Sequence, residues 1–206
     1  TVSDAERLTG VASTDAQPGR YQVEVVSLAA AHRLVSDPFP TSGSAVGTGQ
    51  LTITSGADSM TIEITPDNNT LAGIRDAINA SSNNPGVRAT IITGADGAHL
   101  VITATATGED NAITVNAVAP GSGLEALEYG AGTTNSLTQA TAAADAVVEI
   151  DGFTVTSATN RVEDAIEGIF QTRVDGTILD VNPAFARMIG HESPEALVGA
   201  NAERFY

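Results

Sequence analysis

The chain of 206 residues contains no cysteine, no tryptophan and no lysine, so all nine of its basic residues are arginines. Without cysteine it can form neither disulfide bonds nor thiolate metal sites, and it has no cysteine nucleophile. Without lysine it has no lysine-containing phosphate loop, no Schiff-base residue and no polybasic segment. These absences remove several classes of enzyme and of binding protein.

Positive charge is also scarce. The nine arginines are outnumbered by 25 acidic residues, which gives the chain a formal net charge of −16 at pH 7. Binding to nucleic acid or to an anionic membrane surface depends on clustered positive charge. No apolar run approaches the roughly 20 residues that span a bilayer. We therefore expect neither a nucleic-acid partner nor a membrane partner.

Aromatic residues are few and unevenly distributed. Residues 1–168, which are rich in alanine, threonine, glycine, valine and isoleucine, hold four of the eight aromatic residues, and residues 169–206 hold the other four. This change of composition indicates that the last 38 residues are different material from the rest.

The first 168 residues show the alternation of apolar and polar side chains that is typical of β-strands. The runs with this pattern are residues 21–25, 51–54, 60–65, 87–93, 99–105 and 112–118. Asp151-Gly152 predicts a type I′ turn between strands 147–150 and 153–156, because both turn positions need positive φ. That hairpin would place Val148, Ile150, Phe153 and Val155 on one face, which we expect to be buried.

One helix is well marked, at residues 70–79. Thr70 or Asn69 can cap its N-terminus, and Leu71, Ile74 and Ile78 fall on one stripe. Shorter helical turns are expected at residues 27–34 and 162–166. The predicted fold class is therefore mainly β with a few short helices, that is, α+β.

Two stretches rich in glycine and proline, residues 36–49 and 119–136, look like linkers. They predict a β-rich domain with one helix at 48–118, inserted into a discontinuous outer β-rich domain made of residues 1–37 and 137–168. A short mixed segment, 169–206, follows. The alternative is one sandwich in which the two stretches are long surface loops.

No pattern of catalytic residues is found. His32, His99 and His191 are far apart in the sequence, and none has the spacing of a zinc site. Glycine patterns for nucleotide binding, the nucleophile elbow and the EF-hand loop are also missing. We expect no catalytic, cofactor-binding or metal-binding residues, no cofactor and no enzymatic activity.

Residues 68–80, of sequence NNTLAGIRDAINA, resemble a hallmark of the flagellar filament-capping (hook-associated) protein family. Other segments resemble this family in the family's own order: residues 18–32, 47–53, 86–91, 97–103, 107–115, 143–155 and 160–168. The resemblance covers about residues 1–168 and corresponds to the two β-rich head domains of such proteins.

This resemblance implies a secreted, extracellular structural protein of the bacterial flagellum. Its expected role is to support flagellin assembly at the filament tip, and adhesion is a further role credited to some heads of the family. The implied partners are flagellin and other cap subunits in the full-length protein. The isolated fragment should be a monomer or a weak oligomer, since nothing in it corresponds to the helical legs of the family.

Residues 168–199 resemble the first part of a PAS sensor domain. Asp175-Gly176 predicts a turn, and Asn182-Pro183 predicts the start of a helix. The resemblance stops short of the strands that wall a PAS ligand pocket, so it implies no cofactor. It leaves open a second interpretation, a PAS-containing bacterial signalling protein with a β-rich N-terminal region, and the junction itself could be a natural or an engineered fusion. We also expect residues 169–173 to serve as the last strand of the outer domain.

Overall fold

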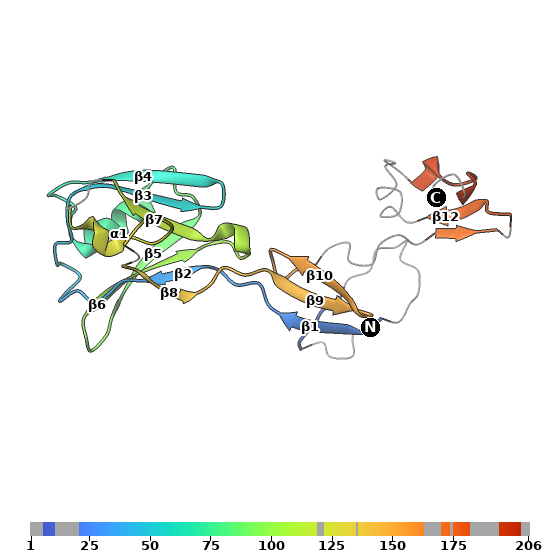
Figure 1. Ribbon diagram of the computed structural model, residues 1–206, viewed down its shortest axis with the longest axis horizontal. Coiled ribbons are helices and arrows are strands. Elements are labelled where there is room, and N and C mark those ends of the chain that lie inside the picture. The colour runs from blue at the N-terminus through green and yellow to red at the C-terminus, as the bar shows by residue number, and fades with distance from the viewer. Residues whose placement is uncertain are drawn as a thin grey trace. The chain divides into compact units, whose positions relative to one another are not determined.

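The computed structural model describes residues 6–10, 21–118, 122–134, 136–162, 170–173, 175–181 and 194–202. The chain divides into a larger unit, Val23–Val162, and a smaller unit formed by Thr1–Gln22 and Glu163–Tyr206. Strands predominate over helices in the described residues, so the prediction of a mainly β fold is confirmed (Figure 1).

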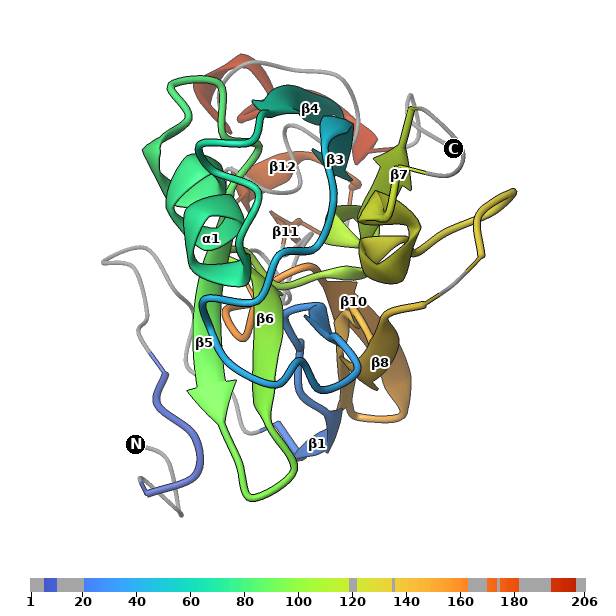
Figure 2. The same cartoon turned by 90° about the vertical axis from the view of Figure 1, so that its left-hand side faces the viewer.

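Two antiparallel sheets form most of the larger unit. We call the part that consists of these sheets and α1 (β2 to β8) the body. One sheet has the order β5-β6-β2-β8, made of Val87–Thr93, Ala98–Ala104, Arg33–Val35 and Thr138–Thr141. The other has the order β4-β3-β7, made of Asp58–Ile64, Gly49–Ser55 and Ile113–Ala117. Figure 2 views the body from the side on which α1 lies in front of β5 and β6.

The two sheets enclose a single hydrophobic core, because alternate residues of their strands point inward. In β4, for example, Met60, Ile62 and Ile64 are buried while the residues between them are exposed. The largest side chains of the core, none of them measurably exposed, are Leu34, Leu51, Ile53, Leu71, Ile74, Ile78, Leu100, Ile102, Ile113, Leu124 and Leu127.

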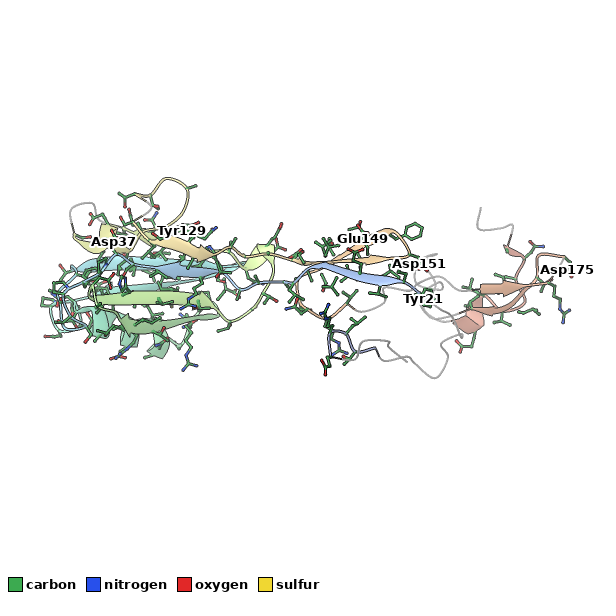
Figure 3. All side chains as sticks on the ribbon, turned by 90° about the horizontal axis from the view of Figure 1, so that it is seen from below. Tyr21, Asp37, Tyr129, Glu149, Asp151 and Asp175 are labelled. Atoms are coloured by element: carbon green, nitrogen blue, oxygen red, sulfur yellow. The ribbon has the colours of Figure 1, made fainter. Side chains whose placement is uncertain are left out.

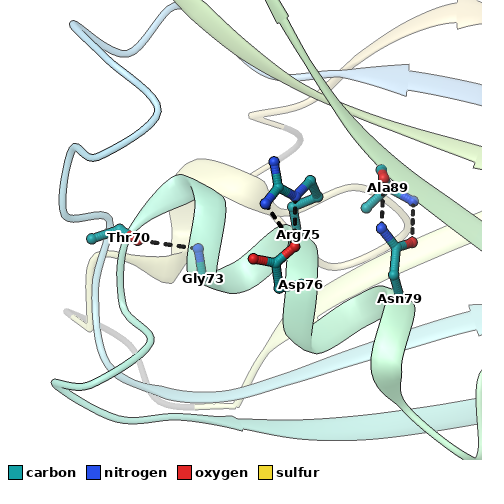
Figure 4. Close-up of polar contacts among 6 residues, drawn as sticks. All are labelled: Thr70, Gly73, Arg75, Asp76, Asn79 and Ala89. Carbon is teal, nitrogen blue, oxygen red and sulfur yellow. Dashed lines mark hydrogen bonds and ion pairs between the residues drawn. The ribbon is translucent and has the colours of Figure 1, made fainter.

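The helix α1 (Leu71–Ala80) packs against β5 and β4 and confirms the helix expected from the sequence. The Thr70 hydroxyl accepts a hydrogen bond from the Gly73 N–H at 3.1 Å, which satisfies one of the free donors of the first turn (Figure 4). Leu71, Ile74 and Ile78 are fully buried, as their spacing predicts.

A third antiparallel sheet, which we call the outer sheet, has the order β1-β9-β10. It consists of Val23–Ser27, Ala146–Ile150 and Phe153–Ser157. Phe153 lies opposite Ile150 and Val155 opposite Val148, the register expected from the sequence. Asp151 and Gly152 have φ of 49° and 85°, so the two-residue turn with positive φ is confirmed.

Two short strands, β2 and β8, were not predicted, and one predicted helical turn is wrong. Residues 27–34 are not helical: Ala30 forms a bridge with Ala144, and β2 begins at Arg33. The chain is extended here because the neighbouring strands β6 and β8 supply partners for its backbone. Residues 163–166, the rest of the other expected turn, lie outside the described residues.

The two stretches expected to be linkers pack against the body where they are described. Phe39 and Ala98 exchange two backbone hydrogen bonds, of 2.9 and 2.7 Å. The 3₁₀-helix η2 (Leu124–Leu127) inserts two leucines into the core, and η1 (Glu109–Asn111) precedes β7. The core thus takes side chains from both sides of residues 48–118, and the division into an inserted and an outer domain remains a prediction.

In the smaller unit, β11 (Phe170–Thr172) pairs with β12 (Ile178–Val181), and η3 (Pro194–Ala196) follows. The turn at Asp175-Gly176 is confirmed: Gly176 has φ 82°, and the Arg173 N–H donates to the Thr177 carbonyl at 2.8 Å. The expectation that residues 169–173 complete the outer sheet is wrong, because β11 finds its partner within its own hairpin. The helix start expected at Asn182-Pro183 lies outside the described residues.

Candidate functional site

The three histidines do not form a common site in the described residues. His32 is buried in the body, His99 lies at the start of β6, and His191 falls outside the described residues. In the part of the chain that the structure describes, no group of three or more histidine or carboxylate residues could hold a metal ion. None of the helices described there is long and apolar enough to span a bilayer. That the chain has no catalytic, cofactor or metal site therefore stays a prediction.

His99 links Asp96, in the β5–β6 loop, to Ser36, the residue that follows β2. Its Nδ1–H donates to the Ser36 carbonyl at 2.8 Å, and its Nε2 lies 3.2 Å from the Asp96 carboxylate. The Ser36 carbonyl, followed by Asp96, raises the pKa of His99 above its usual value. Both ring nitrogens face acceptors, so the arrangement favours the imidazolium form. His99 thereby holds the Ser36 and Asp96 segments together, an arrangement that we call the His99 clasp.

The strongest candidate for a functional surface is one face of the outer sheet. Residues directly opposite each other in an antiparallel sheet share a face, as do residues two apart along a strand. The registers therefore place six apolar side chains on a single face, which we call the outer-sheet face: Val23, Val25, Val148, Ile150, Phe153 and Val155.

The outer-sheet face is only partly buried. Val148 is 8% exposed, whereas Val25 is 42% and Phe153 76% exposed. The expectation that the hairpin buries this whole face is wrong for Phe153, because the sheet carries no second layer of described residues over its tip. Tyr21 and Leu28, just outside β1, are also more than one third exposed. Apolar side chains gathered in this way are typical of a protein–protein contact surface.

The opposite face of the outer sheet is polar and acidic. Glu24 lies directly opposite Glu149, and Thr154 lies beside Glu149 on the next strand. Figure 3 labels Glu149 among the side chains of this sheet. Two like charges at directly opposed positions destabilise a sheet slightly. The charged side chains thus lie on one face of the sheet, and the exposed apolar side chains Val23, Val25 and Phe153 lie on the other.

Side-chain contacts join the outer sheet to the body within the larger unit. The Asn160 amide binds both backbone groups of Ala29, at 2.7 and 3.1 Å. The Thr107 hydroxyl donates to the Ala158 carbonyl at 2.7 Å, and the Glu109 N–H donates to the Asp145 carboxylate at 2.8 Å. A Cβ on Gly108 would meet Ala158 at 2.8 Å, so a glycine is needed at this close approach.

Comparison with known proteins places this architecture in a family. The chain is similar to the crystal structure of the D2-D3 domains of the flagellar cap protein FliD from Escherichia coli, with a TM-score of 0.68 and 31% identity. The match covers 75% of this chain and 81% of that structure. The chain belongs to the flagellar cap protein family.

Other members of the cap protein family agree with this assignment. The FliD (HAP2) structure from Pseudomonas aeruginosa matches with a TM-score of 0.67 and 34% identity, over 76% of this chain and 74% of that one. The B-type flagellar hook-associated protein 2 of the same species is 34% identical over 182 residues. This alignment covers 81% of the chain but only 38% of the relative, so the chain spans about two fifths of a curated cap protein.

Two family models match separate parts of the chain. The flagellin hook IN motif matches residues 50–106, and a PAS domain matches residues 162–206. The first range contains α1 and its Ile78-Asn79 pair, in which Ile78 enters the core and Asn79 binds β5. The second confirms that the tail resembles a PAS domain, and its match begins at residue 162, a few residues before the start at 168 that the sequence analysis expected.

Sequence reasoning did not identify the outer-sheet face as exposed. The alternation of apolar residues predicted which side chains share a face, but burial of that face depends on what lies over it. The composition did hold one signal: Phe153 stands directly beside a tight turn, where a strand end has few neighbours.

Proposed function

We propose that this chain is the head portion of a bacterial flagellar filament cap protein, with a structural role in flagellin assembly at the filament tip. The observation that carries the proposal is the match to the two-domain E. coli cap fragment, over 81% of that structure. The protein would act outside the cell, after secretion, by presenting surfaces to other proteins rather than by catalysing a reaction. Its relatives are named as cap and hook-associated proteins, which supports this.

The partners proposed for the full-length protein are flagellin and further cap subunits. The outer-sheet face supports a role in such contacts, because it exposes valine and phenylalanine side chains. The opposite face of the same sheet carries Glu24 and Glu149. The net charge of −16 argues against nucleic acid and anionic membranes as partners. The isolated chain would be a monomer or a weak oligomer, since like-charged copies repel each other. An adhesive role of the head is a further part of the proposal.

The proposed division into an outer and an inserted domain is supported by the outer sheet. β1 comes from the N-terminal flank and β9 and β10 from the C-terminal flank, as expected for a discontinuous domain of residues 1–37 and 137–168. The pairing of β2 and β8 with β6 supports a boundary closer to the Ala30–Ala144 bridge than to residues 37 and 137. Expression of residues 31–143 alone tests this: a cooperative unfolding transition is expected, and an unfolded product would contradict it.

A chimera tests the main proposal. Residues 21–162 would replace the matching head region of the P. aeruginosa B-type protein, in a strain that lacks its own cap protein. We expect filaments to assemble and flagellin to stay on the cell. A control chimera with Ile74→Asp, which places a charge in the core, should be exported but fail. Flagellin released into the medium despite export of a folded chimera would refute the proposal.

The second interpretation, a PAS-containing signalling protein, is favoured by the match at residues 162–206 alone. The complete gene separates the two. Long helical segments on both flanks support the cap, whereas a signalling module after residue 206 supports the alternative.

A further inference from the structure

The strand β7 lies at the edge of its sheet, and its outward backbone donors are bound by groups from outside that sheet. The inward side of β7 pairs with β3, from Ile113 opposite Ser55 to Ala117 opposite Leu51. The outward N–H groups of Ile113, Val115 and Ala117 meet three different acceptors. These are His32 Nδ1 at 2.7 Å, the Tyr129 carbonyl at 2.8 Å and the Glu128 carboxylate at 3.2 Å.

His32 fulfils this role only as a neutral imidazole. A backbone N–H can only donate, so Nδ1 carries no proton, and Nε2–H donates to the Gln139 side-chain oxygen at 3.1 Å. The same oxygen accepts from the Tyr129 hydroxyl at 2.6 Å. His32 is 2% exposed, so a proton added at Nδ1 would face the Ile113 N–H with no water to separate the two donors.

The groups that face His32 come from every element packed against it. They are the Ile113 N–H from β7, Gln139 from β8 and the Tyr129 ring, whose centroid is 5.5 Å from that of the imidazole. None of these carries a formal charge at neutral pH. A protonated imidazole would therefore have no counter-charge among these groups. Arg33, the next residue in the sequence, is exposed.

Glu128 fulfils its role only as a carboxylate. It is 7% exposed and accepts hydrogen bonds from the Thr134 N–H and hydroxyl, at 3.0 and 2.9 Å, in addition to that from Ala117. The Thr134 N–H is the main cause of a lowered pKa, which burial and the nearby Glu125 oppose. Protonation would turn an acceptor of three hydrogen bonds into a group that must itself donate one.

We propose that protons open this edge: acidification releases the segment that carries Glu128 and Tyr129 from β7 and frees the backbone donors of the strand. Each of the two acceptors, His32 Nδ1 and the Glu128 carboxylate, binds an outward N–H of β7 only while it carries no proton. The carboxylate of Glu128 stabilises the closed edge above its unfolded pKa, and this is lost as the pH falls through the folded value. An open edge of this kind can pair with an added β-strand.

Amide hydrogen exchange of the complete chain, followed by NMR between pH 7 and pH 3, tests the proposal, because the lowered pKa of Glu128 puts its protonation in acid. Protection factors, corrected for intrinsic rates, would be compared for Ile113, Val115 and Ala117 on the edge and for Ile102 in the centre of the other sheet. We expect the edge amides to lose at least tenfold in protection relative to Ile102 as the pH falls. A constant ratio down to pH 3 would overturn the proposal.

Substitutions assign the effect to its two groups. Glu128→Gln keeps an oxygen acceptor but cannot titrate, so it should flatten the pH dependence. His32→Gln replaces the imidazole with an uncharged side chain that also offers an acceptor to the Ile113 N–H. His99→Gln, which removes a histidine that does not contact β7, should leave the dependence unchanged. An unaltered dependence in both folded glutamine variants would overturn the proposal. If neither variant folds, the wild-type ratio alone decides.

Discussion

The side-chain amide of Asn79 binds both backbone polar groups of Ala89. Its Nδ2 donates to the Ala89 carbonyl at 2.8 Å, and its Oδ1 accepts from the Ala89 N–H at 2.9 Å (Figure 4). The amide thus takes the place of a neighbouring strand at the edge strand β5 and ties the last turn of α1 to the sheet.

Replacing Asn79 with Ala should lower the free energy of unfolding by about 1–3 kcal/mol, because it leaves the two backbone groups of the buried residue Ala89 without this partner. Urea denaturation of the two proteins measures this. Asp76→Ala, one turn away in an exposed pair with Arg75, should change stability by less than about 0.5 kcal/mol. Equal losses in the two variants would contradict the role given to Asn79.

Gly73 is required in the first turn of α1 although glycine is a poor helix former. A Cβ at this position would collide with the Asn68 carbonyl, so Gly73→Ala should destabilise the protein by roughly 1–3 kcal/mol, against the gain of about 1 kcal/mol from helix propensity. Thermal or urea unfolding measures the sum. The reverse substitution at the neighbouring position, Ala72→Gly, should lower the free energy of unfolding by about 1 kcal/mol through helix propensity alone. A stabilised Gly73→Ala variant would show that the close contact yields freely.

The clasp of His99 predicts a pH dependence with a definite sign. Its pKa is raised, so its contribution to stability is complete below the ordinary value of 6.5 and is lost as the pH rises through the folded value. The pKa of Asp96 is lowered, chiefly by its hydrogen bond to His99, so that its part is lost in acid. His99→Gln should therefore reduce the urea midpoint more at pH 5.5 than at pH 8.5. Asp58→Asn, at the start of β4, should leave this difference unchanged.

The outer-sheet face predicts opposite outcomes for two neighbouring positions. Phe153→Ser should change stability by less than about 0.5 kcal/mol, because the ring is 76% exposed, and should reduce self-association and dye binding. Val148→Ala should cost roughly 2 kcal/mol, because Val148 is buried. Light scattering and urea unfolding distinguish the two effects. A large loss of stability in Phe153→Ser would mean that the ring is covered in solution.

The opposed carboxylates of Glu24 and Glu149 predict a stabilising substitution. Glu149→Gln should raise the free energy of unfolding by about 0.2–1 kcal/mol at low ionic strength, and salt should reduce the gain. Glu63→Gln is the matched control, because Glu63 lies opposite Gln50 and accepts its amide hydrogen bond. A gain of equal size in the control would point to net charge rather than to the pair.

The elements that the sequence predicted are those whose geometry is determined locally. The helix α1 has its own cap at Thr70 and its own apolar stripe, and the β9–β10 hairpin has a turn that only a few residue pairs can form. The strands β2 and β8 lack such signals: one has three residues, and the other, TQAT, is exposed throughout. They are extended because β6 offers them an edge, and that depends on residues far away in the sequence.

Burial of the outer sheet was mispredicted for a related reason. Alternation indicates which residues share a face, as it did for Val148 and Phe153, but not whether a second layer covers that face. The contacts of His32 and Glu128 with β7 were equally beyond sequence reasoning, since a lone histidine and a lone glutamate carry no pattern. Only the fold brings them to the same strand edge.

Because β2 and β8 lie side by side, with Arg33 opposite Thr141, the polypeptide enters the body and leaves it on two neighbouring strands. A module whose entrance and exit coincide can be exchanged, enlarged or deleted during evolution while its support keeps its shape. The same property makes the Ala30–Ala144 bridge the natural cutting point for anyone who wishes to graft a foreign domain onto this scaffold.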